Sequence, residues 1–97
     1  MAGYLIANID VKDPTKFEEY RRKVVPVIEK FGGRYLIRGG DVRRLEGNLP
    51  FKRVVVLEFP TVEAAQQFYD STEYQPILNL RLASTQSDVV LVQGYSG

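Results

Sequence analysis

The sequence has no cysteine and no histidine among its 97 residues. This absence excludes disulfide bonds, cysteine nucleophiles, histidine general bases, and zinc sites built from thiolate or imidazole. A haem iron would have to take an axial ligand from tyrosine or methionine, which is rarer, so haem chemistry is disfavoured. We therefore expect no metal and no other cofactor.

Long apolar runs and an excess of one charge are also lacking. No apolar stretch approaches the ~20 residues of a membrane helix, and the first ten residues show no basic segment followed by an apolar run, as a secretory signal would. The 13 basic and 12 acidic side chains give a net charge of +1. We expect a cytoplasmic protein that does not bind membranes.

The composition is that of one folded domain. Hydrophobic residues make up 44% and charged residues 26% of the chain, which is ordinary for a soluble globular protein. Because 97 residues are too few for two cores, residues 1–97 are expected to form a single domain.

The first third of the chain predicts a strand followed by a helix. Tyr4–Val11 is apolar and rich in β-branched residues, and it ends at a Lys-Asp-Pro turn. The helix begins either with Asp13 as N-cap and Pro14 at its first position, or with a capping box made by Thr15 and Glu18. Two glycines end it. Its core stripe, spaced by three and four residues, is Phe17, Tyr20, Val24, Val27, Ile28 and Phe31.

The middle of the chain predicts a hairpin and a buried strand. A second strand over Arg34–Arg38 and a short edge segment over Val42–Glu46 are separated by a Gly-Gly-Asp turn. Lys52–Phe59 contains three valines and a leucine in succession, which indicates a strand that is apolar on both faces.

The last third predicts a broken helix and a final strand. Val62–Tyr69 forms the first helical segment, and a capping box of Thr72 and Gln75 begins the second. Ser87–Tyr95 is the last strand. The resulting βαββαβ order predicts an α+β protein of ferredoxin-like architecture, with a four-stranded antiparallel sheet and both helices on one of its faces.

The other face of that sheet needs a partner. The third and fourth strands are apolar on both sides, and leaving several valine and leucine side chains in water would forgo several kcal/mol at ~25 cal/mol per Å². Twofold self-association is the simplest remedy. We expect a homodimer formed through the sheet faces.

Five segments and one arginine carry a resemblance to a known family. They are FGGRYLIRGG at 31–40, LEG at 45–47, VLEFP at 56–60, FYDSTEYQP at 68–76, VQG at 92–94, and Arg81. Together they resemble the bacterial domain-of-unknown-function family 1330 over almost the whole chain. The resemblance implies the dimeric α+β barrel fold, whose relatives include cofactor-independent quinone-forming monooxygenases, muconolactone isomerases, haem-degrading monooxygenases and stress-response proteins. It implies no single reaction.

Arg81 and Glu58 are the candidate catalytic residues. Arg81 projects from the apolar stripe of the last helical segment, where a cation needs a partner. Glu58 is the only acid within the apolar third strand and is the first choice, ahead of Asp10 and Asp88 near strand ends. The pair is either a buried structural ion pair or a site in which Arg81 holds an anionic or carbonyl group and Glu58 moves a proton.

Candidate ligand-binding residues lie among apolar positions. Asn8 shares a face of the first strand with Tyr4 and Ile6, and its amide must find hydrogen bonds. With the tyrosines it could supply polar groups to an apolar pocket, or the tyrosines simply pack in the core with their hydroxyls at its rim. The set is Asn8, Tyr20, Tyr69, Tyr74 and Arg81.

The basic residues cluster in the first 60 positions. These carry 12 cations and 8 anions, whereas residues 61–97 carry one cation and four anions, an asymmetry that suits contacts between protomers or an anionic ligand. An RNA-binding βαββαβ domain would need stacking aromatics on its third strand, and Lys52–Phe59 offers valines there instead. We expect no nucleic-acid partner.

Three functions follow, in order of preference. The first is a homodimer that binds, or binds and converts without a cofactor, a small apolar or aromatic metabolite in a pocket between helices and sheet. The second is a non-catalytic stress-response or accessory homodimer. The third is the RNA-binding domain.

Overall fold

A computed structural model describes residues 1–96 of the chain. Its four strands form one antiparallel sheet in the order β2-β3-β1-β4, so the predicted ferredoxin-like α+β fold is confirmed. No helix in this part of the chain is both long and apolar enough to cross a membrane. The elements are β1 (Gly3–Val11), α1 (Pro14–Lys30), β2 (Arg34–Gly40), β3 (Val54–Phe59), α2 (Val62–Asp70), α3 (Gln75–Ser84) and β4 (Thr85–Gln93).

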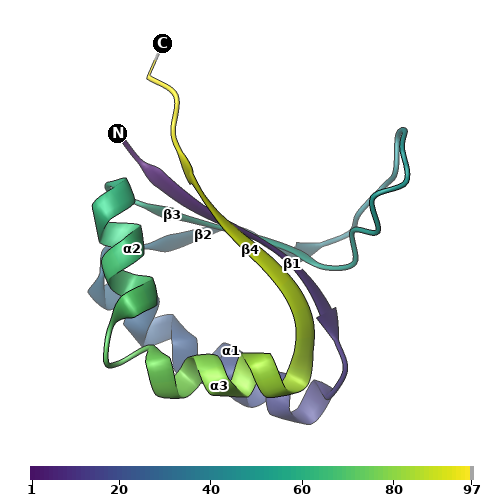
Figure 1. The fold of residues 1–97 in the computed structure, drawn as a ribbon, viewed down its shortest axis with the longest axis horizontal. Helices are drawn as coiled ribbons and strands as arrows, with labels where there is room; N and C mark the ends of the chain where they lie inside the picture. The colour runs from purple at the N-terminus through teal and green to yellow at the C-terminus, as the bar shows by residue number, and fades with distance from the viewer. Residues whose placement is uncertain (97) are drawn as a thin grey trace.

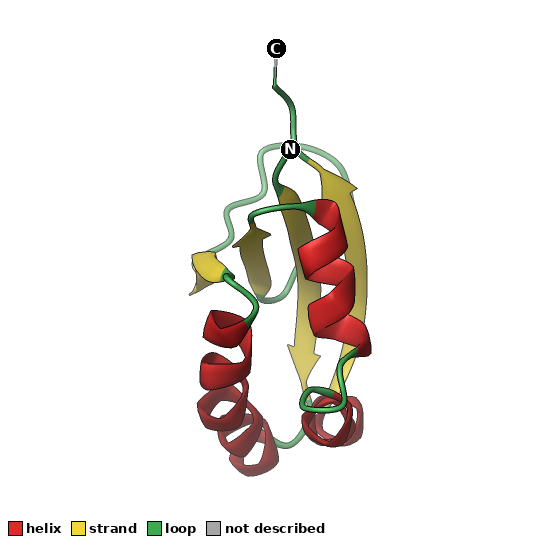
Figure 2. Ribbon diagram, turned by 90° about the vertical axis from the view of Figure 1, so that its left-hand side faces the viewer, coloured by secondary structure: helices red, strands yellow, loops and turns green. Residues whose placement is uncertain are grey.

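All three helices lie on the same side of the sheet (Figures 1 and 2). The core fills the space between them, and its most deeply buried large side chains are Phe59 of β3, Phe68 of α2 and Val24 of α1. The ring of Phe68 lies 5.2 Å from that of Phe59 and 6.2 Å from that of Phe31. These tilted and edge-on contacts are the arrangements that aromatic rings prefer.

Helix α1 begins at the first of its two predicted starts. The side chain of Asp13 accepts a hydrogen bond from the N–H of Lys16, and Pro14 occupies the first turn, so the N-cap is Asp13 and not the Thr15–Glu18 box. At the other end Gly32 has φ +79°, which only glycine adopts without strain.

Two local predictions were wrong. The edge segment predicted at Val42–Glu46 is not a strand, because it lies in a loop over residues 41–53 and all five of its residues are exposed. Leu45 in this loop is 89% exposed. The predicted Thr72–Gln75 capping box is also absent. The Ser71 hydroxyl instead accepts the N–H of Tyr74 before α3.

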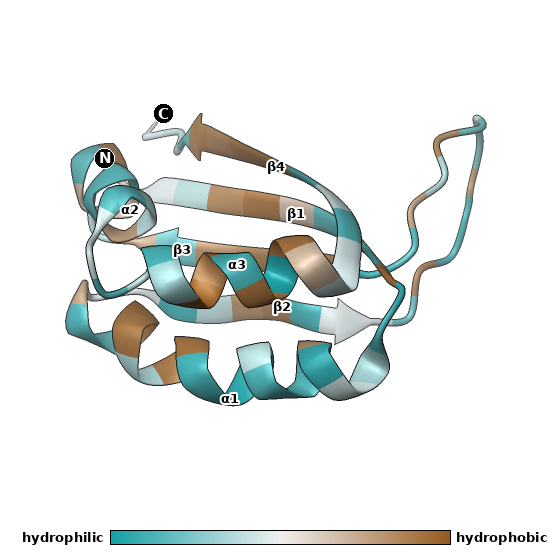
Figure 3. Ribbon diagram, turned by 60° about the horizontal axis from the view of Figure 1, so that its bottom comes forward, coloured by the Kyte–Doolittle hydropathy of each residue, from teal (hydrophilic) through white to brown (hydrophobic). Residues whose placement is uncertain are grey.

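The two faces of the sheet carry different side chains because successive strand residues alternate between faces. In β1, Leu5 and Ile9 are buried under the helices, and Figure 3 shows the hydrophobic strands behind α3 and α1. The opposite side, which we call the open face, has no helix over it. From the strand pairing it contains Tyr4, Ile6 and Asn8 of β1, Val54, Val56 and Glu58 of β3, Val90 and Val92 of β4, and Ile37 of β2.

Strand β2 changes its alternation at a β-bulge. Tyr35 pairs with Leu57, but the next pair is Ile37 with Val56, so Leu36 is an extra residue. Arg38 then pairs with Val55. As a result Tyr35 and Arg38, three residues apart, both lie on the helix-covered face.

The close approach of Gly33 to the core gives a test of this packing. A Cβ atom at Gly33 would lie 2.6 Å from the Phe59 ring and 2.9 Å from the Ile28 side chain. We predict that Gly33→Ala lowers the free energy of unfolding by about 1–3 kcal/mol, the usual cost of overpacking a core. Gly40→Ala is the matched control, since a Cβ there has no neighbour within 4 Å. Urea denaturation of both variants decides, and equal stabilities would contradict the packing described.

Candidate functional site

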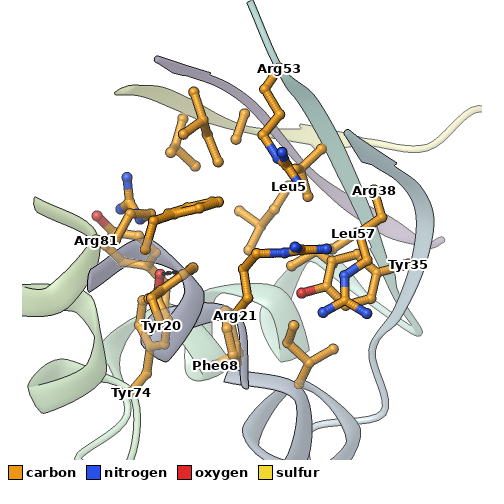
Figure 4. Close-up of a pocket in the computed structure, with 17 residues that line it drawn as sticks. Leu5, Tyr20, Arg21, Tyr35, Arg38, Arg53, Leu57, Phe68, Tyr74 and Arg81 are labelled. Carbon is orange, nitrogen blue, oxygen red and sulfur yellow. Dashed lines mark hydrogen bonds between the residues drawn. The ribbon is translucent and has the colours of Figure 1, made fainter. Parts of the chain in front are cut away.

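A pocket lies between the helices and the covered face of the sheet (Figure 4). Nine of its lining side chains are apolar, including Leu5, Ala7 and Ile9 along β1. The cavity has a volume of about 50 Å³, which is room for a few water molecules. Its polar lining consists of four tyrosines, Tyr20, Tyr35, Tyr69 and Tyr74, and four arginines, Arg21, Arg38, Arg53 and Arg81.

Two tyrosine hydroxyls meet in the pocket from different elements. The hydroxyl of Tyr20 on α1 lies 2.8 Å from that of Tyr74, the residue before α3. Burial raises the pKa of Tyr20 well above its ordinary value, and the Tyr74 hydroxyl raises it further. Tyr20 is therefore a neutral phenol near pH 7. Because only one O–H is used in the bond between the two hydroxyls, the pair retains one that can donate to a ligand.

Arg81 is a buried cation in the same pocket. Its residue surface is only 3% exposed, and its Nη1 donates a hydrogen bond to the Ser87 hydroxyl of β4. Its Nε atom is buried and has no hydrogen-bond partner. A buried guanidinium with an unused N–H is costly, so Arg81 stands out from the ordinary packing around it.

Three further arginines, which were not predicted as site residues from the sequence, also line the pocket. Arg53, just before β3, lies over the Phe17 ring at 5.4 Å, and its Nε is also buried without a partner. Arg38 lies over the Tyr35 ring at 4.5 Å. The sequence could have predicted that Arg53 lies on the covered face, because it is spaced by two residues from Val55 and continues the alternation of Val55, Leu57 and Phe59.

The predicted Arg81–Glu58 ion pair does not form. Glu58 lies on the open face, where its carboxylate accepts hydrogen bonds from Nε of Arg34 at 2.8 Å and from the Tyr4 hydroxyl at 2.9 Å. The sheet thus separates it from Arg81. The two weaker choices do not reach Arg81 either. Asp10 pairs with Lys12, and Asp88 lies opposite Asn8 in the strand pairing.

Asn8 was predicted as a ligand-binding residue, but its side chain is also on the open face. Its amide donates to the carbonyl of Pro50 at 3.2 Å and accepts the N–H of Lys52 at 2.8 Å. Asn8 therefore fastens the end of the 41–53 loop to β1. Of the predicted set, Tyr20, Tyr69, Tyr74 and Arg81 come together in the pocket, and Asn8 and Glu58 do not.

Within residues 1–96 no group of three or more acidic side chains is placed to hold a metal ion. The lining of the pocket offers a ligand an apolar surface, phenolic O–H groups and guanidinium N–H groups. These are the polar and apolar parts from which small-molecule sites are usually built.

Comparisons with known proteins agree with this architecture. A family model described as "Domain of unknown function (DUF1330)" matches residues 2–95. No curated protein gives a match. Among solved structures, a protein of unknown function from Rhodopseudomonas palustris is 17% identical, with a TM-score of 0.81 and coverage of 99% of this chain and 84% of that one.

Two further structures share the fold at lower similarity. SnoaB, a cofactor-independent oxygenase from Streptomyces nogalater, is 12% identical with a TM-score of 0.63 and covers 99% of this chain and 95% of its own. A dimeric ferredoxin-like protein of unknown function from Jannaschia sp. CCS1 is 12% identical with a TM-score of 0.65, covering 97% and 100%.

The Glu58 contacts predict a pH dependence of stability. Hydrogen bonds from Arg34 and then Tyr4 hold the pKa of Glu58 below its ordinary value of 4.5. A carboxyl with a lowered folded-state pKa stabilises the fold above the unfolded-state pKa and loses that contribution as the pH falls through the folded-state value. We predict that the stability advantage of the wild type over Glu58→Gln is present at pH 7 and shrinks below about pH 4.5.

Denaturation at a series of pH values measures this difference. Glu29→Gln, which removes an exposed carboxylate with no ion pair among the described residues, controls for the loss of one negative charge. An advantage over Glu58→Gln that grows on acidification would be inconsistent with the Arg34–Glu58–Tyr4 contacts.

Proposed function

The chain belongs to the DUF1330 family, and we propose that it binds a small apolar or aromatic molecule in the pocket between helices and sheet, as a homodimer joined through the open faces. The observation that carries the proposal is the convergence of Tyr20, Tyr74 and Arg81 on one apolar space. Ordinary cores avoid such a combination, because each buried polar tip must be satisfied.

The arrangement also suits conversion of the bound molecule. Arg81 would orient an oxygen atom of the ligand, and the Tyr20–Tyr74 hydroxyl pair would donate a hydrogen bond, or a proton, to it. Glu58 takes no part, because it lies across the sheet. The cofactor-independent oxygenase SnoaB has the same fold, which supports a pocket of this kind working without a metal, although a fold alone does not transfer a reaction.

Filling the pocket tests the binding function. Ala7 lines the pocket from β1, and Ala7→Leu would occupy its limited space. We predict that a library of small aromatic and aliphatic compounds gives ligand-observed NMR binding signals with the wild type and that these are lost in Ala7→Leu. Ala83→Leu, at an exposed position of α3, is the matched control and should bind as the wild type does. Equal binding by both variants would place the ligand elsewhere.

The proposed dimer is formed through the open face, whose exposed apolar side chains support it. Its apolar residues include Ile6, Val56 and Ile37, and Val90 is 54% exposed. Rows of exposed apolar side chains are uncommon on monomers and typical of interfaces. A dimeric neighbour with the same fold adds support. Figure 1 shows the 41–53 loop projecting on this side of the sheet, away from the helices, where it would flank a second copy.

A single charge on the open face tests the dimer. We predict that Val90→Asp shifts the protein from dimer to monomer, since a carboxylate buried in an apolar interface is unpaired. Leu82→Asp is the control, because Leu82 is 57% exposed but lies on α3, on the other side of the sheet. Native mass spectrometry reports the state of each. A monomeric wild type, or a dimeric Val90→Asp, would refute the sheet-face dimer.

A further inference from the structure

The pocket has a one-sided charge. Four guanidinium groups line it, and no carboxylate does among the residues the structure describes. Of these four arginines only Arg21 has an ion pair in that part of the chain, with Glu18 on the exposed side of α1. Arg38, Arg53 and Arg81 have no carboxylate partner there.

Arg81 is the most deeply buried of these groups. It is 97% buried, and its polar neighbours are uncharged: Nη1 donates to the Ser87 hydroxyl, and Tyr74 also interacts with the guanidinium. Its Nε–H has no acceptor. Isolated buried charges are expensive unless a counter-charge is close, so a molecule that brings a negative charge to Arg81 gains binding energy from this unused N–H.

Arg53 and Arg38 are held so that they add to the same positive field. Each guanidinium lies over an aromatic ring, Arg53 over Phe17 and Arg38 over Tyr35, and such contacts orient a cation without neutralising it. Arg53 also packs against Gly39, where a Cβ atom would come within 2.7 Å of its Nε. The Gly39 position has φ +74°, so the backbone there leaves room for the guanidinium.

We propose that the ligand is an organic anion, a small apolar or aromatic carboxylate whose carboxylate group is bound by Arg81. This inference rests on the proposed function, because it names the class of molecule that the same pocket takes. Figure 4 shows Arg81 beside Tyr20 and Tyr74 on one side of the pocket, with Arg38 beside Tyr35 on the other. The apolar body of the ligand lies between them, against β1.

The chemistry of the lining favours a carboxylate over a larger anion. A planar guanidinium matches a carboxylate through two parallel N–H bonds, and the Tyr20–Tyr74 pair offers a further O–H donor. The mostly apolar lining and the space of about 50 Å³ suit a compact ligand with one charged end. They provide no room for the several charges of a nucleotide.

Matched acids and amides test the proposal with known compounds. Benzoate with benzamide, and hexanoate with hexanamide, differ in charge while keeping nearly the same shape. We expect titrations of the full-length wild type, followed by NMR, to give acids that bind at least about tenfold more tightly than their amides, the fold-change that a charge-assisted hydrogen bond supplies. Raising the salt concentration should weaken only the acids.

Two variants locate the effect. Arg81→Gln should abolish the preference for acid over amide. Arg38→Gln should reduce this preference, and because Arg38 is at a more exposed position, the buried packing should stay unchanged. Arg22→Gln removes an exposed arginine of α1 that does not line the pocket, and it should keep the full preference. If Arg81→Gln fails to fold, the comparison of Arg38→Gln with Arg22→Gln decides.

The outcomes separate this inference from the function on which it rests. Amides that bind as tightly as acids would overturn the anionic ligand and leave the pocket's binding function standing. A preference for acids that survives in both Arg81→Gln and Arg38→Gln would overturn the assignment of the charge to this pocket. If none of the four compounds, nor any member of the neutral library, binds, both proposals are refuted.

Discussion

Helices cover only one face of the sheet, and this one-sided packing governs where each strand side chain lies. Because all three helices pack on the same side, every strand residue belongs either to the core or to the open face. In β1 this alternation sends Ala7 to the pocket and Asn8 to the loop contact. In β3 it sends Leu57 to the core and Glu58 to the opposite side. A single strand therefore supplies residues with unrelated roles.

The covered face departs most clearly from simple apolar packing at Arg81. Around Phe68 and Tyr74, whose rings lie 4.5 Å apart, the aromatic core is continuous. Arg81 then enters it from α3 with one N–H bonded to Ser87 and one without an acceptor. A well-packed core has no need of such a group, since replacing buried ions with apolar residues is often neutral or stabilising. The ligand proposed above would complete its contacts.

The open face and the pocket are independent surfaces. A second copy placed on Val56 and Val90 would cover the side of the sheet away from the helices, whereas the pocket lies on the covered side. The Asn8 contacts with Pro50 and Lys52 hold the end of the 41–53 loop beside that interface. Substitutions on the open face and in the pocket would therefore test the proposed assembly and the proposed ligand binding separately.

The order of the elements could be predicted from the sequence, because the caps and turns that delimit them are local. Asp13 with Pro14 begins α1, the two glycines end it, and the helical spacing of Tyr20 and Arg81 places them on helix faces turned to the core. Even Arg53 could have been assigned to the pocket from its alternation with Leu57 and Phe59.

The side of the sheet on which each polar strand residue lies depends on tertiary contacts. β3 is apolar on both faces, so its pattern does not distinguish the core side from the open side, and Glu58 was expected beside Arg81. The bulge at Leu36 moved Arg38 to the pocket side, which strict alternation from Tyr35 would have forbidden. Such decisions depend on partners distant in the chain, which local patterns do not record.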